Sequence, residues 1–248
     1  MKRLFLSFVY YPVHGLCRRI LFIRDYVDFK KKSSEEARFS LNWSDRRPEL
    51  DDHTPATHFD THYIYHPAWA ARILAKTKPK EHIDISSALS FPSIVSAFLP
   101  VRFYDYRPAH LLLTGLTTDS TDLLQLPFAD GSITSLSCMH TVEHIGLGRY
   151  GDPLDPAGDK KAAKELARVL ARGGNLLFVV PVGKPRIAFN AHRIYSYAHV
   201  HELFPDLVLK QCSLVPDDAL SHGMIENATE HDVNAQTYGC GCFWFVKE

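Results

Sequence analysis

Three aspartates lie at positions where a nucleoside could be bound. Asp84 ends a short apolar run, Asp105 ends a second one, and Asp122 lies in a loop further along the chain. If these runs are neighbouring parallel strands, their carboxyl ends meet at one edge of a sheet, where such sheets bind ligands. A carboxylate on the second strand can accept both ribose hydroxyls, and one in the next loop can accept the exocyclic amine of adenine. Any one aspartate could be a turn or helix-capping residue, so the prediction rests on the ordered set.

Three histidines are candidates for acid–base chemistry, because imidazole titrates near neutral pH. His140 directly follows a predicted strand and is therefore the best-placed general base. His144 and His192 are weaker candidates. The chain has 14 histidines, so each of the three could instead be a packing or hydrogen-bonded residue.

The segment from His140 to His144 also satisfies H-x-x-E-H, a pattern in which two histidines on a helix bind zinc and the glutamate, here Glu143, activates water. Glu226 or Glu230 could supply a third ligand. The segment begins at the end of a predicted strand, however, and not inside a helix. A zinc hydrolase is therefore a minor alternative, and we expect no resident metal.

The cysteines give no sign of a disulfide framework. Five are present, an odd number, and they are scattered apart from the pair Cys240 and Cys242. This pattern is typical of a reducing compartment. A single C-x-C pair is weak evidence for a metal site, since closed zinc sites need four ligands in paired spacing. We expect these cysteines to be small residues entering the last strand.

The elements that must hold these residues alternate between short apolar strands and helices. Pro67 is expected at the first position of a helix, where its missing N–H costs nothing. Short strands that alternate with helices pair in parallel, with helices on both faces. The sequence therefore predicts an α/β fold, a Rossmann-like doubly wound sheet of seven mostly parallel strands. The expected strands are residues 81–85, 101–105, 111–116, 132–139, 175–182, 207–215 and 243–247, and the later helices are residues 92–99 and 160–170, the second of them stopped by Gly173 and Gly174.

Length and composition set the class of protein. The chain has 248 residues, 28 Lys and Arg against 28 Asp and Glu, and 46% hydrophobic residues. This is the composition of a globular protein that is long enough for one large α/β domain with an extension. A net charge of zero argues against a nucleic-acid partner, because phosphate binding needs a surplus of cations.

Residues 1–32 differ from the rest of the chain, with eight Lys and Arg against two Asp and many interleaved apolar side chains. Their apolar run is too short to span a bilayer. The segment could lie in the interface of an anionic membrane or pack on the main domain. Residues 33–60 are expected to connect this arm to a domain of residues 61–248. We expect a cytoplasmic protein with peripheral contact at the inner membrane face through residues 1–32.

Three stretches resemble the class I S-adenosylmethionine-dependent methyltransferases. An aspartate precedes LPF and an acidic turn, a strand then leads into an EHI-like segment, and a helix ends in RVL-x-x-GG before the fifth strand. The likeness spans residues 81–215. The insertion RYGDP-x-DP resembles an uncharacterised methyltransferase-like family, a domain of unknown function. The three stretches are residues 122–133, 138–145 and 164–174, and the insertion lies in residues 146–156.

This resemblance implies S-adenosylmethionine as the cofactor. Asp84 and the turn after it would lie around the methionine part, Asp105 would bind the ribose, and Asp122 would lie at the adenine. The implied cofactor-binding residues are Asp84, Ser86, Ala88, Asp105, Tyr106, Asp122, Leu123 and His140.

One segment departs from the family pattern. The family has glycines at alternating positions after the first strand, and this chain has Ser86, Ala88 and Ser90. Glycine is favoured there because the backbone turns tightly and lets the ligand approach. Serine and alanine are the smallest substitutes, but a positive φ is costly for either of them.

The resemblance also implies methyl transfer, with the catalytic residues among the three histidines. The preferred acceptor is a small molecule or glycan, a sugar hydroxyl above all. Arg149, Asp152 and Asp155 either line an acceptor pocket or are turn residues. The alternative is a binding protein that keeps the fold without its catalytic activity.

Overall fold

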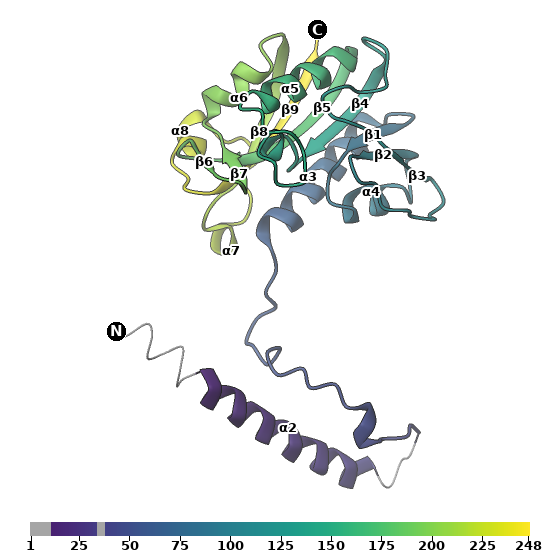
Figure 1. Ribbon diagram of the computed structural model, residues 1–248, viewed down its shortest axis with the longest axis vertical. Coiled ribbons are helices and arrows are strands. Elements are labelled where there is room, and N and C mark those ends of the chain that lie inside the picture. Colours follow the sequence, from purple (N-terminus) through teal and green to yellow (C-terminus); the bar gives the residue numbers. More distant parts are fainter. Residues whose placement is uncertain (1–10, 34–37) are drawn as a thin grey trace. The chain divides into compact units, whose positions relative to one another are not determined.

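The computed structural model describes residues 11–33 and 38–248 (Figure 1). The chain forms two compact units, residues 1–58 and 59–248. The second unit begins two residues before the predicted domain and contains the sheet.

The sheet has seven strands in the order β3-β2-β1-β4-β5-β9-β8. β1 pairs in parallel with both β2 and β4, whereas β9 runs antiparallel to β5 and β8. The predicted Rossmann-like, mostly parallel sheet is therefore confirmed. The strands are β1 His82–Ile85, β2 Val101–Asp105, β3 Leu116–Ser120, β4 Ile133–Met139, β5 Leu170–Val182, β8 Leu207–Val215 and β9 Gly239–Lys247, with β6 Arg186–Ala188 and β7 His192–Ile194 forming a separate antiparallel pair.

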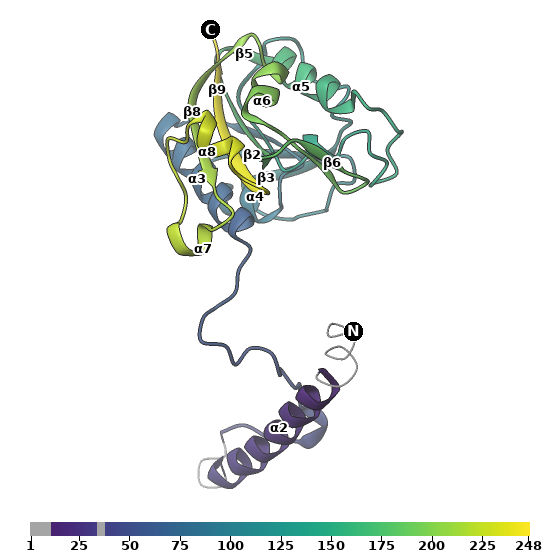
Figure 2. The same cartoon turned by 90° about the vertical axis from the view of Figure 1, so that its left-hand side faces the viewer.

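Helices cover both faces of the sheet, as Figure 2 shows for α5 and α6 on one side and α3 and α4 on the other. Successive residues of β5 point to opposite faces: Leu176 and Phe178 pack in the core with α5 and α6, and Leu177 and Val179 pack in the core with α3 and α4. The helices of this unit are α3 Thr61–Thr77, α4 Ser90–Val95, α5 Gly158–Val169, α6 Tyr197–Leu203, α7 Ala219–His222 and α8 Glu230–Asn234, with the 3-10 turn η3 Val142–His144.

Helix α3 begins earlier than predicted. Its N-cap is Asp60, whose carboxylate accepts a hydrogen bond from the backbone N–H of Tyr63 at 3.2 Å. Pro67 therefore lies inside the helix and not at its start, and it cannot donate to the carbonyl four residues before it. The helix tolerates the proline because its following turns bury Trp69 and Ile73 against the sheet. The extra turns bring residues 61–66 to the carboxyl edge of the sheet.

Other predicted boundaries are also wrong. The third strand was expected at residues 111–116 but occupies Leu116–Ser120, because an edge strand needs few apolar residues and Leu112 is fully exposed. Helix α5 ends at Val169, so Gly173 and Gly174 do not stop it. They lie within β5, where the register with β4 shifts.

The loop after β3 is held by Arg168 of α5. Its guanidinium donates to the carbonyls of Phe128 at 2.8 Å and Leu126 at 3.0 Å, and it pairs with Glu165. Glu165 in turn accepts from the backbone N–H of Leu126 at 2.9 Å. These contacts give a physical reason for the joint presence of LPF and RVL in the sequence, since the arginine fixes the loop that carries Asp122.

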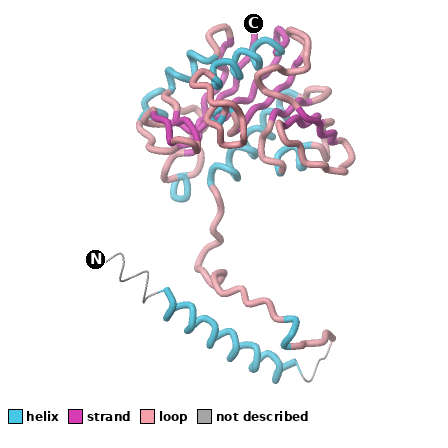
Figure 3. Tube along the Cα trace, viewed as in Figure 1, coloured by secondary structure: helices cyan, strands magenta, loops and turns pink. Residues whose placement is uncertain are grey.

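In the first unit, α2 Tyr11–Ser33 is followed by the 3-10 turn η2 Trp43–Asp45, and residues 46–60 form neither helix nor strand (Figure 3). Phe22 and Tyr26 pack on Trp43, with ring centroids 6.5 and 4.9 Å from it. Leu16 and Ile20 lie on another face of α2 and are exposed. Among the described helices, none has the length and hydropathy needed to cross a bilayer.

Candidate functional site

Two cavities lie at the carboxyl edge of the sheet. The smaller has a volume of about 260 Å³ and the larger about 980 Å³. Ser86, His140, His144 and Tyr150 line both of them. A molecule in one cavity can therefore meet a molecule in the other at these four side chains.

Most of the predicted cofactor-binding residues line one wall of the smaller cavity. Asp105 ends β2, and one of its carboxylate oxygens accepts from the backbone N–H of Arg107 at 2.7 Å. Asp122 similarly accepts from the backbone N–H of Leu124 at 2.8 Å. Each aspartate is fixed by a short loop of its own, which preorganises its carboxylate. The predicted residues in this cavity are Ser86, Asp105, Tyr106, Asp122, Leu123 and His140.

Asp84 and Ala88 lie elsewhere. Asp84 is fully buried behind the turn, where it accepts hydrogen bonds from the hydroxyl of Ser137 and from the backbone N–H of Ser87 at 3.1 Å. Burial raises the pKa of Asp84 to about 6, although the hydrogen bonds from Ser137 and Ser87 oppose the shift. Asp84 therefore positions the turn and does not line either cavity. Ala88 lines the larger cavity.

The backbone is left-handed at two non-glycine residues of the shared wall. φ is +57° at Ser86 and +56° at His140. The N–H of Ser86 donates to the carbonyl of Tyr104 at 2.7 Å, and that of His140 donates to Val179 at 2.8 Å, so both conformations are held by the adjacent strands. The serine that replaces a family glycine thus stands where a positive φ is required. Strained conformations of this kind cluster at functional sites.

His140 is not the free base that the sequence suggested. Its Nδ1 lies 2.9 Å from Oε1 of Glu143, and its Nε2 lies 3.4 Å from Sγ of Cys240. Burial alone lowers the pKa of His140, but Cys240 and Glu143 outweigh it and raise the pKa to about 10. Both ring nitrogens are therefore engaged within the protein.

His144 has one ring nitrogen that could accept a proton. Its Nδ1 lies 2.6 Å from the carbonyl oxygen of Ala191, which can only accept, so in the neutral ring Nδ1 carries the hydrogen and Nε2 has the lone pair. Arg193 of β7 donates to the carbonyl of Ile145 at 2.7 Å and thereby fixes the loop after η3. His192 lines the larger cavity, and burial lowers its pKa.

The H-x-x-E-H segment does not form a helical zinc site. His140 follows β4 and His144 ends η3, so the two rings are not one helical turn apart. The Nδ1 of each already has a protein partner. Neither Glu226 nor Glu230 is among the residues that line the two cavities.

The acidic residues of the insertion are turn residues. Asp152 accepts from the backbone N–H of Gly146 at 2.7 Å, and backbone hydrogen bonds of this kind outweigh partial burial and lower its pKa. Asp155 accepts from Lys161 at 2.7 Å. Both aspartates border the smaller cavity and Arg149 the larger, so the predicted acceptor pocket does not include all three.

One wall of the larger cavity, supplied by α3 and the residues before β9, was not predicted from the sequence. His62 and Tyr63 come from the first turn of α3, and Tyr238 immediately precedes β9. The ring of His62 stacks on those of His140 and Tyr238, with centroids 5.6 and 5.2 Å away. A helix capped by Asp60 places His62 and His66 one turn apart, whereas a helix that starts at Pro67 includes neither residue.

Comparison with known proteins agrees with this architecture. Residues 130–207 match the model of a family described as "Caenorhabditis protein of unknown function, DUF268". No curated protein matches the sequence.

Solved structures give the fold. An assigned sarcosine dimethylglycine methyltransferase from Galdieria sulphuraria is similar with a TM-score of 0.52 and 15% identity over 73% of this chain and 85% of that one. The N-methyltransferase NodS from Bradyrhizobium japonicum, solved with S-adenosyl-L-homocysteine, has a TM-score of 0.50 and 12% identity over 73% of this chain and 85% of its own. The cyclase SpnF has a TM-score of 0.50 and 11% identity over 73% of this chain and 81% of its own. The second unit therefore has the class I methyltransferase fold, which a cyclase shares.

Because φ is positive at Ser86, glycine should be more stable than alanine at this position, the reverse of their usual order. Ser86→Gly should be more stable than Ser86→Ala by about 1–2 kcal/mol, because a Cβ is unfavourable in the left-handed region. The measurement is urea unfolding of both variants. The same pair at Ser93, inside α4, is the control, and there alanine should be the more stable by about 0.5–1 kcal/mol. Equal stability of the two variants at position 86 would show that no positive φ is required.

Proposed function

We propose that this protein is an S-adenosylmethionine-dependent methyltransferase acting on a small hydroxylated acceptor. The observation that carries the proposal is the pair of cavities that share Ser86, His140, His144 and Tyr150. Methyl transfer needs a donor and an acceptor held in line, which is mainly a positioning task. Two adjoining cavities with a common wall provide such an arrangement.

The smaller cavity would hold the adenosyl part of the cofactor. Asp105 would accept from the ribose hydroxyls with the carboxylate oxygen that its own loop leaves available. Asp122 and Leu123 would contact the adenine from the loop that Arg168 fixes. The left-handed turn at Ser86 supports this fit, because it directs the backbone around the cavity in the way that a glycine would.

S-adenosylmethionine supplies a methyl group on a sulfonium; the electron pair of the broken carbon–sulfur bond stays on sulfur, and the new bond forms to the acceptor oxygen. The acceptor hydroxyl must also lose a proton. His144 would take it at Nε2, since its Nδ1–H is fixed on the carbonyl of Ala191. Glu143, whose Oε1 lies 3.8 Å from that Nε2, would stabilise the imidazolium that results.

The larger cavity would bind the acceptor. Its lining mixes aromatic rings, Tyr63 and Tyr238 among them, with charged side chains such as Arg149. Aromatic faces and hydrogen-bonding groups together suit a sugar, which has an apolar ring face and many hydroxyls. The volume of about 980 Å³ leaves room for more than a single small group. A glycan hydroxyl is therefore the acceptor that we propose.

We further propose that α2 binds an anionic membrane surface from the cytoplasmic side. Leu16, Ile20 and Val27 are exposed within the first unit and recur at helical spacing. The helix also ends in a run of three lysines, Lys30–Lys32. Exposed apolar side chains beside a cationic run match the chemistry of an anionic bilayer interface.

Cofactor binding is tested by calorimetric titration with S-adenosylmethionine. We expect micromolar affinity, weakened at least tenfold by Asp105→Ala, because hydrogen bonds to a charged group contribute about 1.5–3 kcal/mol. Asp119→Ala, on the neighbouring strand β3, is the matched control and should bind as the unaltered protein does. No heat at millimolar ligand would favour a binding protein that only keeps the fold.

The acceptor class is tested with S-adenosylmethionine carrying a labelled methyl group. Label should enter simple glycosides and not peptides or RNA, and His144→Gln should lower the turnover by about 10²–10⁴-fold while cofactor binding persists. Label in peptides alone would exclude a sugar acceptor.

The membrane proposal is tested by sedimentation with vesicles. The full chain should sediment with anionic vesicles at low salt and less so at high salt, whereas a chain lacking residues 1–32 should stay in solution. Both hydrophobic cores lie within residues 59–248, so the shortened chain should keep its fold. Vesicles of neutral lipid are the control. If the full chain does not sediment with anionic vesicles at low salt, the membrane proposal is refuted.

A further inference from the structure

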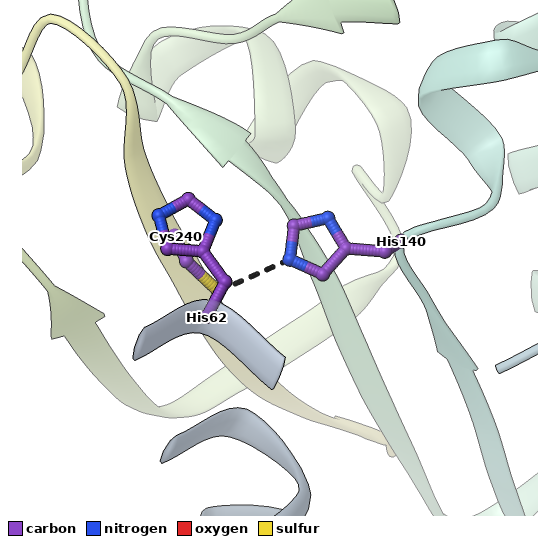
Figure 4. Close-up of side chains that lie close together, drawn as sticks. All are labelled: His62, His140 and Cys240. Carbon is purple, nitrogen blue, oxygen red and sulfur yellow. Dashed lines mark hydrogen bonds between the residues drawn. The ribbon is translucent and has the colours of Figure 1, made fainter. Parts of the chain in front are cut away.

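Three potential metal ligands from distant parts of the sequence meet at the base of the larger cavity. His62 lies in the first turn of α3, His140 follows β4, and Cys240 lies at the start of β9 (Figure 4). One ligand atom from each lies within 4.8 Å of the other two. We propose that these three residues bind a divalent transition metal, zinc above all.

The atoms are spaced as a zinc site requires. Zinc bonds of about 2.3 Å to sulfur and about 2.0–2.1 Å to nitrogen, at tetrahedral angles, place the sulfur about 3.6 Å from the nitrogen. Nε2 of His140 lies 3.4 Å from Sγ of Cys240. The rings of His62 and His140 are nearly parallel, with an interplanar angle of 9°. An imidazole binds a metal in the plane of its ring, so the ring of His62 must turn out of this stacked arrangement to complete the ligand set. A mixed imidazole and thiolate set selects zinc over magnesium or calcium.

The surroundings of the ligands resemble the outer shell of a metal site. A metal-binding histidine usually donates its other N–H to a carboxylate or a carbonyl. Nδ1 of His140 does so to Glu143 at 2.9 Å. His66, one helical turn after His62, is completely buried, and its Nδ1 bonds the carbonyl of His62 at 2.7 Å. Its Nε2 has no hydrogen-bond partner, although its side chain lies beside that of Cys240.

Close packing holds the sulfur in place. Cys240 is fully buried on the face of β9 that packs with α3. Gly241, the next residue, has no room for a side chain, because a Cβ would lie 2.6 Å from atoms of Val182 and Phe243. This part of β9 is therefore closely packed on both faces of the sheet, and the strand fixes the position of the thiol.

The site is of the kind that keeps an open coordination position. His62 and His140 line the larger cavity, and His62 is partly exposed to it. Three protein ligands with a fourth position open to a cavity are typical of catalytic zinc. If the proposed methyl transfer is correct, the metal would polarise the acceptor hydroxyl and make its proton easier to remove.

Metal content and cobalt spectroscopy test the site without reference to methyl transfer. Full-length protein from zinc-supplemented medium should retain about one zinc per chain after dialysis. Cys240→Ser and His62→Ala should each lose it. Cys212→Ser, which alters another buried cysteine, should retain it. Cobalt added to the metal-stripped protein should give a thiolate-to-cobalt charge-transfer band.

The outcomes separate this proposal from the proposed function. Zinc binding that Cys240→Ser leaves unchanged, or a cobalt spectrum without the thiolate band, would overturn the metal site. The cobalt measurement uses the unaltered chain and so does not depend on the folding of a variant. S-adenosylmethionine binding, measured by calorimetry on the stripped protein, reports on the smaller cavity in the absence of the metal.

Discussion

The parallel pairing of β1 with β4 is the constraint on which the rest of the site depends. It brings the chain after each strand to the same point, and at that point Ser86 and His140 both take a left-handed conformation. The hydroxyl of Thr141 donates to the carbonyl of Ser86 at 3.1 Å and joins the two turns. The backbone therefore turns sharply at the end of both strands, and a cavity can form on either side of these two turns.

The sequence predicted the sheet, apart from the position of its third strand, and several of the residues that line the smaller cavity. The positions of Asp105 and Asp122 could be predicted because the sequence pattern immediately around each of them indicates the strand or loop in which it lies. The apolar runs of β4, β5 and β8 are likewise visible without any tertiary information. Asp84 was assigned to the right strand end, but alternation of side chains along β1 buries its carboxylate between Ser137 and Ser87 and keeps it out of the cavities.

The larger cavity could not be predicted in the same way. Its wall combines α3, the segment after β4 and the residues before β9, which lie far apart in sequence. The first turn of α3 was not predicted, because proline is usually found at the start of a helix and Pro67 lies inside this helix. The partners of the His140 ring could not be predicted for a similar reason: Cys240 is 100 residues away and reaches His140 through the antiparallel pairing of β9 with β5.

The crowding around Gly241 also bears on how this chemistry could be recognised in other chains. In a protein that keeps both flanking cysteines but carries a larger residue between them, the side chains of Val182 and Phe243 or the last strand itself must shift. A shift of the strand would move the sulfur away from the imidazoles even though all three proposed ligands were still present. We therefore expect a glycine at that position wherever the same three residues bind a metal.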